Sequence, residues 1–115
     1  MDSTQLEEIR DIWIDAFFHG DYDVLLSYEA EHFKVVYEQE DRVESNYTRY
    51  DRIAHAVNNG VWKPQKLNVE AEEFDFDAAS KTCKVLIILG DDHKNIQETW
   101  EYDQEWKIIE LRFLK

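Results

Sequence analysis

Large apolar and polar side chains alternate along the last part of the chain, and this alternation predicts a β-hairpin. One alternating run extends from Ile96 to Tyr102, and a second run starts at Trp106 after three polar residues. Successive side chains of a strand point to opposite faces, so each run fits a strand with one apolar face. We therefore expect two antiparallel strands joined by a short loop.

The register of this hairpin determines which side chains share a face. A loop of three residues sets Trp100 opposite Ile108. The same register sets Glu98 opposite Glu110, with Arg112 diagonally next to Glu98. Two neighbouring carboxylates in an apolar site resist double ionisation, and a nearby arginine opposes that effect. These three charged residues are our candidate catalytic group, with one carboxylate as general base; a structural ion cluster at the rim of a pocket is the alternative.

The other face of the last strand is also apolar. It carries Ile109, Leu111 and Phe113, so this strand should be covered on both sides. An apolar face of this size rarely stays bare on a monomer. We expect a homodimer in which this face, with part of the apolar run from Val85 to Leu89, is buried.

Helical spacing of apolar residues predicts two helices at the start of the chain. The first should end before Gly20, and the second should run from a capping Asp21 to about Tyr28. Both would lie against the sheet like a lid. The apolar face of the first helix consists of Leu6, Ile9, Ile12, Trp13, Ala16 and Phe17.

Further strands and a third helix are predicted between these two ends. In order they are a strand at 33–37, a short strand at 43–47, a helix from 48 to about 58, a strand at 67–76 and a strand at 82–89. Thr48 is the expected cap of the helix. In the strand at 67–76 the apolar residues Leu67, Val69 and Ala71 have odd numbers, whereas Phe74 and Phe76 have even numbers. This change of face at Glu72-Glu73 predicts a β-bulge. The continuous apolar run from Val85 to Leu89 predicts a buried strand in the middle of the sheet.

Length and charge limit the classes of protein. With 115 residues, 43% of them hydrophobic, the chain fits one domain spanning 1–115. Its net charge of -13 repels nucleic acid and anionic membranes, so a basic protein is the favoured macromolecular partner. We see no apolar run of about 18 residues and no signal-peptide pattern, and we expect a cytoplasmic protein.

The residue types that commonly hold metals and cofactors are sparse. His19, His32, His55 and His93 show no ligand spacing, and three glycines form no phosphate-binding loop. The single Cys83 lies within a predicted strand and fits a packed or edge thiol better than a nucleophile. We therefore expect neither a metal nor another cofactor.

The order of elements resembles the nuclear transport factor 2-like (NTF2-like) superfamily, which includes SnoaL-like cyclases and ketosteroid isomerases. The residues that carry the resemblance are the 33–37 strand after a short helix, and Thr99-Trp100 through Trp106-Lys107-Ile108 in the hairpin. The resemblance implies an α+β cone of cystatin-like type, in which a bent mixed or antiparallel sheet wraps around the first helix. It also implies a small-molecule pocket inside the cone and a dimer through the outer sheet face.

The catalytic residues of the resembled family are not retained. Tyr37 stands at what looks like the position of the general-base aspartate, and a tyrosine is a poor base at neutral pH. Trp13 or Phe17 replaces the phenol that such enzymes supply from the first helix. Catalysis by the family's route is thus not expected.

Two functions remain open from the sequence. The first is a pocket that binds a small apolar molecule bearing a polar or cationic group, either without catalysis or as a lyase, isomerase or hydrolase with a non-standard site. The second is an acidic protein-binding module, such as an immunity protein against a basic toxin or an association domain. The aromatic residues expected to contact a ligand are Trp13, Phe17, Tyr37, Trp62, Trp100 and Tyr102.

Overall fold

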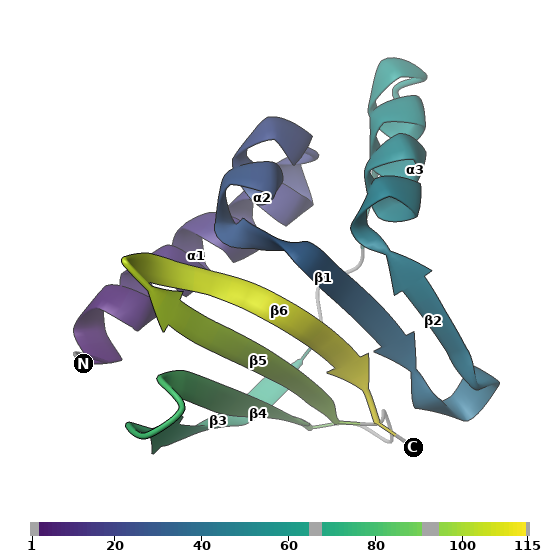
Figure 1. Cartoon of the computed structure of the whole chain (residues 1–115). Coiled ribbons are helices and arrows are strands. Elements are labelled where there is room, and N and C mark those ends of the chain that lie inside the picture. The colour runs from purple at the N-terminus through teal and green to yellow at the C-terminus, as the bar shows by residue number, and fades with distance from the viewer. Residues whose placement is uncertain (1–2, 65–67, 91–94, 115) are drawn as a thin grey trace.

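A six-stranded curved sheet with one long helix across its inner face forms the molecule (Figure 1). The structure is a computed structural model that describes residues 3–64, 68–90 and 95–114; Leu67 and His93 lie outside the described residues. The elements are α1 (Ser3–His19), α2 (Tyr22–Tyr28), β1 (Glu29–Tyr37), a 3-10 turn η1 (Glu38–Glu40), β2 (Arg42–Ser45), α3 (Asn46–Asn58), β3 (Val69–Asp77), β4 (Thr82–Leu89), β5 (Ile96–Asp103) and β6 (Glu105–Phe113).

The strand order is β2-β1-β6-β5-β4-β3, and every pair is antiparallel except β1 with β6. The sheet is therefore mixed, and it bends around α1 (Figure 1). This confirms the predicted α+β cone. The strand from Val85 to Leu89 belongs to β4, which lies next to the edge strand β3 and not in the middle of the sheet as predicted.

The helices begin and end largely where local signals place them. The Asp21 side chain accepts a hydrogen bond from the Val24 amide and caps α2, as predicted. Gly20, with φ of 69°, ends α1. The predicted cap of α3 is wrong, because Ser45 accepts from the Thr48 amide and the helix starts two residues earlier.

The inner face of α1 packs on the sheet as its spacing predicts, with one addition and one exception. Trp13 contacts Trp100 of β5 edge to face, with the ring centroids 5.7 Å apart. Arg10 is buried in the same face. Ile12 is 46% exposed, because a turn of about 100° from Trp13 carries it off the stripe.

A β-bulge in the last hairpin changes which residues face the interior. Near the loop the predicted pairing is confirmed, and Trp100 stands opposite Ile108. The register then shifts, so that Ile109 has no partner on β5 and Glu98 stands opposite Leu111. One extra residue reverses the faces of all residues beyond it. The predicted pairing of Glu98 with Glu110 is therefore wrong. The bulge predicted in β3 does exist, but it lies between Val69 and Ala71.

Glu110 and Arg112 lie on the outer face of the sheet, away from Glu98. Glu110 is opposite Thr99, and Arg112 donates to Glu110 over 2.6 Å and to Glu38 over 2.8 Å. These carboxylates raise the pKa of Arg112. The predicted catalytic group of three residues thus does not assemble.

The same bulge overturns the predicted apolar outer face. Leu111 and Phe113 pack against the core and line the interior cavity. Of the three residues, only the half-buried Ile109 neither packs against the core cluster nor lines that cavity. A dimer through these three side chains as one exposed face is excluded by this geometry. Leu86 and Ile88 of β4 are half-buried apolar residues on the outer face.

Candidate functional site

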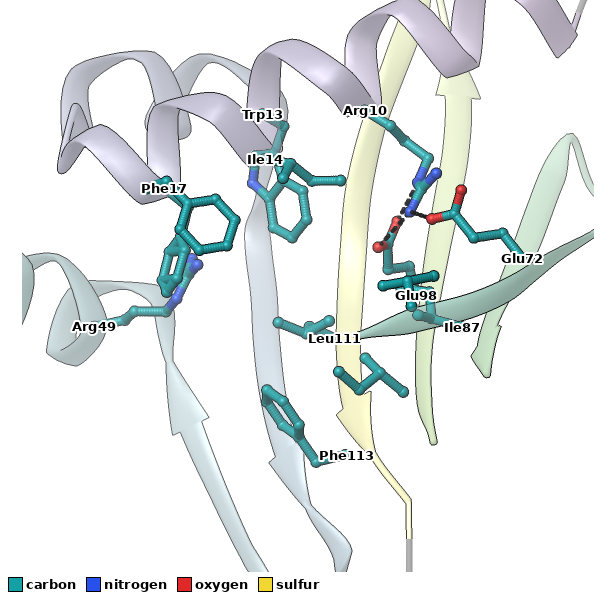
Figure 2. Close-up of a pocket in the computed structure, with 13 residues that line it drawn as sticks. Arg10, Trp13, Ile14, Phe17, Arg49, Glu72, Ile87, Glu98, Leu111 and Phe113 are labelled. Carbon is teal, nitrogen blue, oxygen red and sulfur yellow. Dashed lines mark hydrogen bonds and ion pairs between the residues drawn. The ribbon is translucent and has the colours of Figure 1, made fainter. Parts of the chain in front are cut away.

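A cavity of about 290 Å³ lies inside the cone between α1 and the sheet, and we name it the α1 cavity (Figure 2). Its wall is almost wholly apolar, and it is partly open to solvent. The wall consists of Arg10, Trp13, Ile14, Phe17, Phe18, Arg49, Val69, Glu72, Ile87, Ile96, Glu98, Leu111 and Phe113. Charged groups stand at opposite ends of this cavity with apolar side chains between them (Figure 2).

One charged end is a buried ion cluster between α1, β3 and β5. Arg10 donates to Glu98 through Nε over 2.7 Å and through Nη2 over 2.9 Å, and Nη2 also reaches Glu72 over 2.9 Å. Glu98 further accepts from Trp100 Nε1 over 2.7 Å. Arg10 and Glu98 are 3% and 2% exposed, whereas Glu72 is 36% exposed. Both oxygens of Glu98 are thus occupied.

Burial alone would lower the pKa of Arg10, but the hydrogen bonds and charges of Glu98 and Glu72 together raise it above its ordinary value. Arg10 therefore stays charged in the core. The cluster carries one positive and two negative charges, and the excess negative charge falls on the side chain nearest to solvent, Glu72.

The second charged group lies at the base of α3. Glu29, fully buried at the start of β1, accepts from Arg49 Nη1 over 2.6 Å, Tyr50 Oη over 2.6 Å and Trp13 Nε1 over 2.8 Å. Burial and the Glu29 carboxylate raise the pKa of Tyr50, so the phenol remains a donor. Three donors satisfy this carboxylate without water.

Aromatic rings enclose the Arg49 guanidinium. Its central carbon lies 5.3 Å from the Phe17 ring centroid, 5.5 Å from that of Phe33 and 6.0 Å from that of Trp13. Such contacts orient a cation and add to its attraction when water is excluded. Arg49 is therefore held in one position at the cavity wall.

A second cavity, of about 400 Å³, adjoins the first, and we name it the α3 cavity. The two share Phe17, Arg49, Leu111 and Phe113. The wall of the α3 cavity consists of Phe17, Val35, Tyr37, Arg49, Arg52, Ile53, Trp62, Pro64, Leu111 and Phe113. Arg49 thus stands where the two cavities meet.

Four of the six predicted ligand-contacting aromatic residues lie at these cavities. Trp13 and Phe17 line the α1 cavity, and Phe17, Tyr37 and Trp62 line the α3 cavity. The other two do not line either one: Trp100 is fully buried in the core, and Tyr102 packs on Trp106 at 5.3 Å. The structure does not bring these two residues to either cavity wall, and their contact with a ligand stays a prediction.

Sequence reasoning missed Arg10, Glu29 and Arg49. Arg10 carries a usable signal, because it lies four residues after Leu6 and three before Trp13 on the apolar face of α1. Arg49 similarly lies four residues before the buried Ile53. A charge inside an apolar stripe indicates a buried partner, although it does not identify that partner.

Cys83 is packed in the core, as predicted, and its thiol is free; burial raises its pKa to about 11. Within the described ranges, no group of three or more His, Cys, Asp and Glu side chains could hold a metal ion. Among the helices described, none is long and apolar enough to cross a membrane.

Solved structures share this architecture over nearly the whole chain. An NTF2-like protein from Cytophaga hutchinsonii superposes with a TM-score of 0.76 at 10% identity, covering 97% of this chain and 96% of that chain. The chain has the NTF2-like fold. An NTF2-like protein of unknown function in nutrient uptake from Rhodospirillum rubrum gives 0.70 at 14% identity, covering 93% and 94%.

Another solved structure with the NTF2-like fold is the S. rosetta CaMKII hub, with a TM-score of 0.67 at 14% identity, covering 95% of this chain and 92% of that chain. No protein-family model matches the sequence, and no curated protein matches it. At these identities the likeness establishes the fold, and an NTF2-like fold hosts many functions.

Proposed function

We propose that this protein binds a small, largely apolar molecule inside the cone. The α1 cavity carries the proposal: a void of about 290 Å³ with an apolar wall and charged groups only at its ends. Ligand sites commonly combine an apolar wall of this size with a few fixed polar groups. Unfilled apolar space costs stability, and a bound apolar molecule would recover part of that cost.

Binding is a better account of the site than catalysis. A general base needs a carboxylate oxygen that is free to take a proton from substrate. Glu98 has both oxygens occupied by Arg10 and Trp100, and Glu29 accepts from three donors. Glu110, on the outer face, does not line the cavity. The carboxylates predicted to be catalytic therefore favour a structural role.

Filling the cavity tests this proposal. Leu111 lines both cavities, so Leu111→Trp should reduce binding of the apolar fluorescent dye 1-anilinonaphthalene-8-sulfonate by about tenfold or more. Leu26→Trp is the matched control, because Leu26 is 53% exposed on α2 and lines neither cavity. Equal dye affinity in the two folded variants would refute binding inside the cone.

A second candidate function is association with another protein, favoured by two observations. The fold matches a CaMKII hub, and β3, at the edge of the sheet, has acidic residues at five of its nine positions. An edge strand exposes unpaired backbone groups that another strand can join. A basic extended segment is the partner that this charge would favour.

Association is tested with a defined peptide. A fluorescent peptide of alternating Lys and Val should bind at low salt and weaken as salt screens the charge. Neutralising Glu70, Glu73 and Asp75 together should abolish that binding. A salt-independent affinity, or no effect of the triple variant, would assign the acidic residues to solubility alone.

A homodimer through the outer sheet face is retained as part of this second proposal, with its apolar centre moved to β4. Leu86 and Ile88 are half-buried there. Leu86→Glu should dissociate a dimer in sedimentation at micromolar concentration. A monomeric wild type would contradict it.

A further inference from the structure

The α3 cavity has a cationic wall in an acidic protein. The chain has 26 acidic and 13 basic residues, yet the ionisable residues that line this cavity are Arg49, Arg52 and Tyr37. Among the lining residues of the described chain there is no Asp or Glu. Two guanidinium groups on a wall without a carboxylate favour an anionic ligand over a cationic one.

The carboxylates that balance these arginines stand behind them and not on the cavity wall. Glu29 binds Nη1 of Arg49, and Glu44 binds Nη1 and Nη2 of Arg52 over 2.7 and 2.9 Å. Both carboxylates are buried, at 3% and 5% exposure. They hold the guanidinium groups in place without occupying the cavity.

Arg49 keeps one edge of its guanidinium group available. Nη1 donates to Glu29, and the hydrogen bonds among the described residues leave Nε and Nη2 without an acceptor. The residue is only 5% exposed and lines both cavities. Nε and Nη2 together form the planar pair of donors that matches the two oxygens of a carboxylate.

The charges near the α3 cavity also favour an anion. Arg49 pairs with Glu29 and Arg52 with Glu44, while Arg42, which does not line the cavity, pairs with Glu40 over 2.9 Å and with Glu44 over 3.5 Å. An incoming anion thus meets two guanidinium groups on the described cavity wall, whereas their carboxylate partners do not line it.

We propose that the ligand is an organic monocarboxylate with a flat apolar body, an inference that rests on the proposed small-molecule binding. Its carboxylate takes the Nε and Nη2 edge of Arg49, with Arg52 near by. Its body lies against Phe17, Leu111 and Phe113, which lead into the α1 cavity. The opposite orientation is disfavoured, because the far end carries two carboxylates, Glu72 and Glu98, against one arginine, Arg10.

Three probes of one shape test the charge preference. Isothermal titration calorimetry with 2-naphthoate, 2-naphthamide and 2-naphthylmethylammonium, at pH 7 and low salt, compares an anion, a neutral amide and a cation. The naphthoate should bind about tenfold tighter than the amide, because its hydrogen bonds to Arg49 are charge-assisted. The cation should bind more weakly still.

Two variants locate that preference. Arg49→Lys keeps a positive charge for Glu29 but loses the planar fork, so the naphthoate-to-amide ratio should fall towards one. Arg52→Gln, at a side chain that is 52% exposed, should lower the ratio, and Glu44 keeps its contact with Arg42 in this variant. Lys107→Gln removes the same charge from an exposed pair with Glu105 and should leave the ratio unchanged.

The outcomes separate this inference from the proposed function. If the amide or the cation binds to the cone as tightly as naphthoate, the carboxylate inference is wrong while small-molecule binding stands. If none of the three binds to the folded protein and the dye does not bind either, both are wrong. A preference for naphthoate that survives Arg49→Lys and Arg52→Gln equally would also overturn the assignment to Arg49.

Discussion

Replacing Arg10 by methionine should expose how much of the fold depends on one buried ion pair. Arg10→Met keeps most of the side-chain volume but leaves Glu98, 2% exposed, with Trp100 as its only remaining hydrogen-bond donor. Glu72 adds little to the loss, since at 36% exposure it is partly hydrated. Removing one partner of a buried pair costs about 3 to 5 kcal/mol.

Urea unfolding followed by tryptophan fluorescence measures this loss. With an m-value of about 1.5 kcal/mol/M, a loss of about 3 kcal/mol lowers the midpoint by about 2 M. Lys107→Met is the control, because it breaks an exposed pair of 3.6 Å and should cost less than about 0.5 kcal/mol. The deficit of Arg10→Met should shrink on acidification from pH 7 towards pH 4, because the stranded carboxylate can then take up a proton.

A double-mutant cycle completes the test. Glu98→Gln removes the charge and keeps an oxygen for Trp100 Nε1, so it should relieve part of the cost of Arg10→Met. The free energy of unfolding of the double variant should exceed the additive expectation by about 1 kcal/mol or more. A loss below about 1 kcal/mol for Arg10→Met, or strict additivity, would refute the buried-pair account.

Three further predictions follow from single contacts. Gly20→Ala should destabilise the protein by about 1 kcal/mol more than Gly60→Ala. Both glycines have φ of 69°, but a Cβ at position 20 would meet side-chain atoms at 2.5 and 2.7 Å, whereas a Cβ at position 60 would meet no atom within 4 Å. Equal midpoints in urea would contradict this prediction. The pKa of Tyr50 is raised, so its contribution to stability is fully present below a pH of about 10 and is lost as the pH rises through the raised value. Ultraviolet titration should therefore show one tyrosine fewer titrating in the native protein. Tyr50→Phe should lose less stability above pH 10 than the wild type. Glu98→Gln and Arg112→Leu should be additive within about 0.5 kcal/mol, because the two side chains lie on opposite faces of the sheet; a larger coupling in urea unfolding would restore the predicted three-residue cluster.

The sequence by itself determined the elements of this protein and their class of fold. The strand 82–89 was predicted with the bounds that the structure shows, and the cap at Asp21 and the terminator at Gly20 were predicted correctly. These features depend on alternation, helical spacing and backbone groups within a few residues. The order of the elements then indicated the NTF2-like fold through its resemblance to that superfamily.

Only the tertiary structure decided the site. Arg10 and Glu98 are 88 positions apart, and Glu29 and Arg49 are 20 apart, so no local pattern pairs them. The unpaired Ile109 has a local signal, since apolar parity changes along the last strand, but the strand was interpreted as apolar on both faces. The backbone hydrogen bonds to β5 choose between a bulge and a two-sided strand, and that choice places each side chain beyond it inside the cone or outside it.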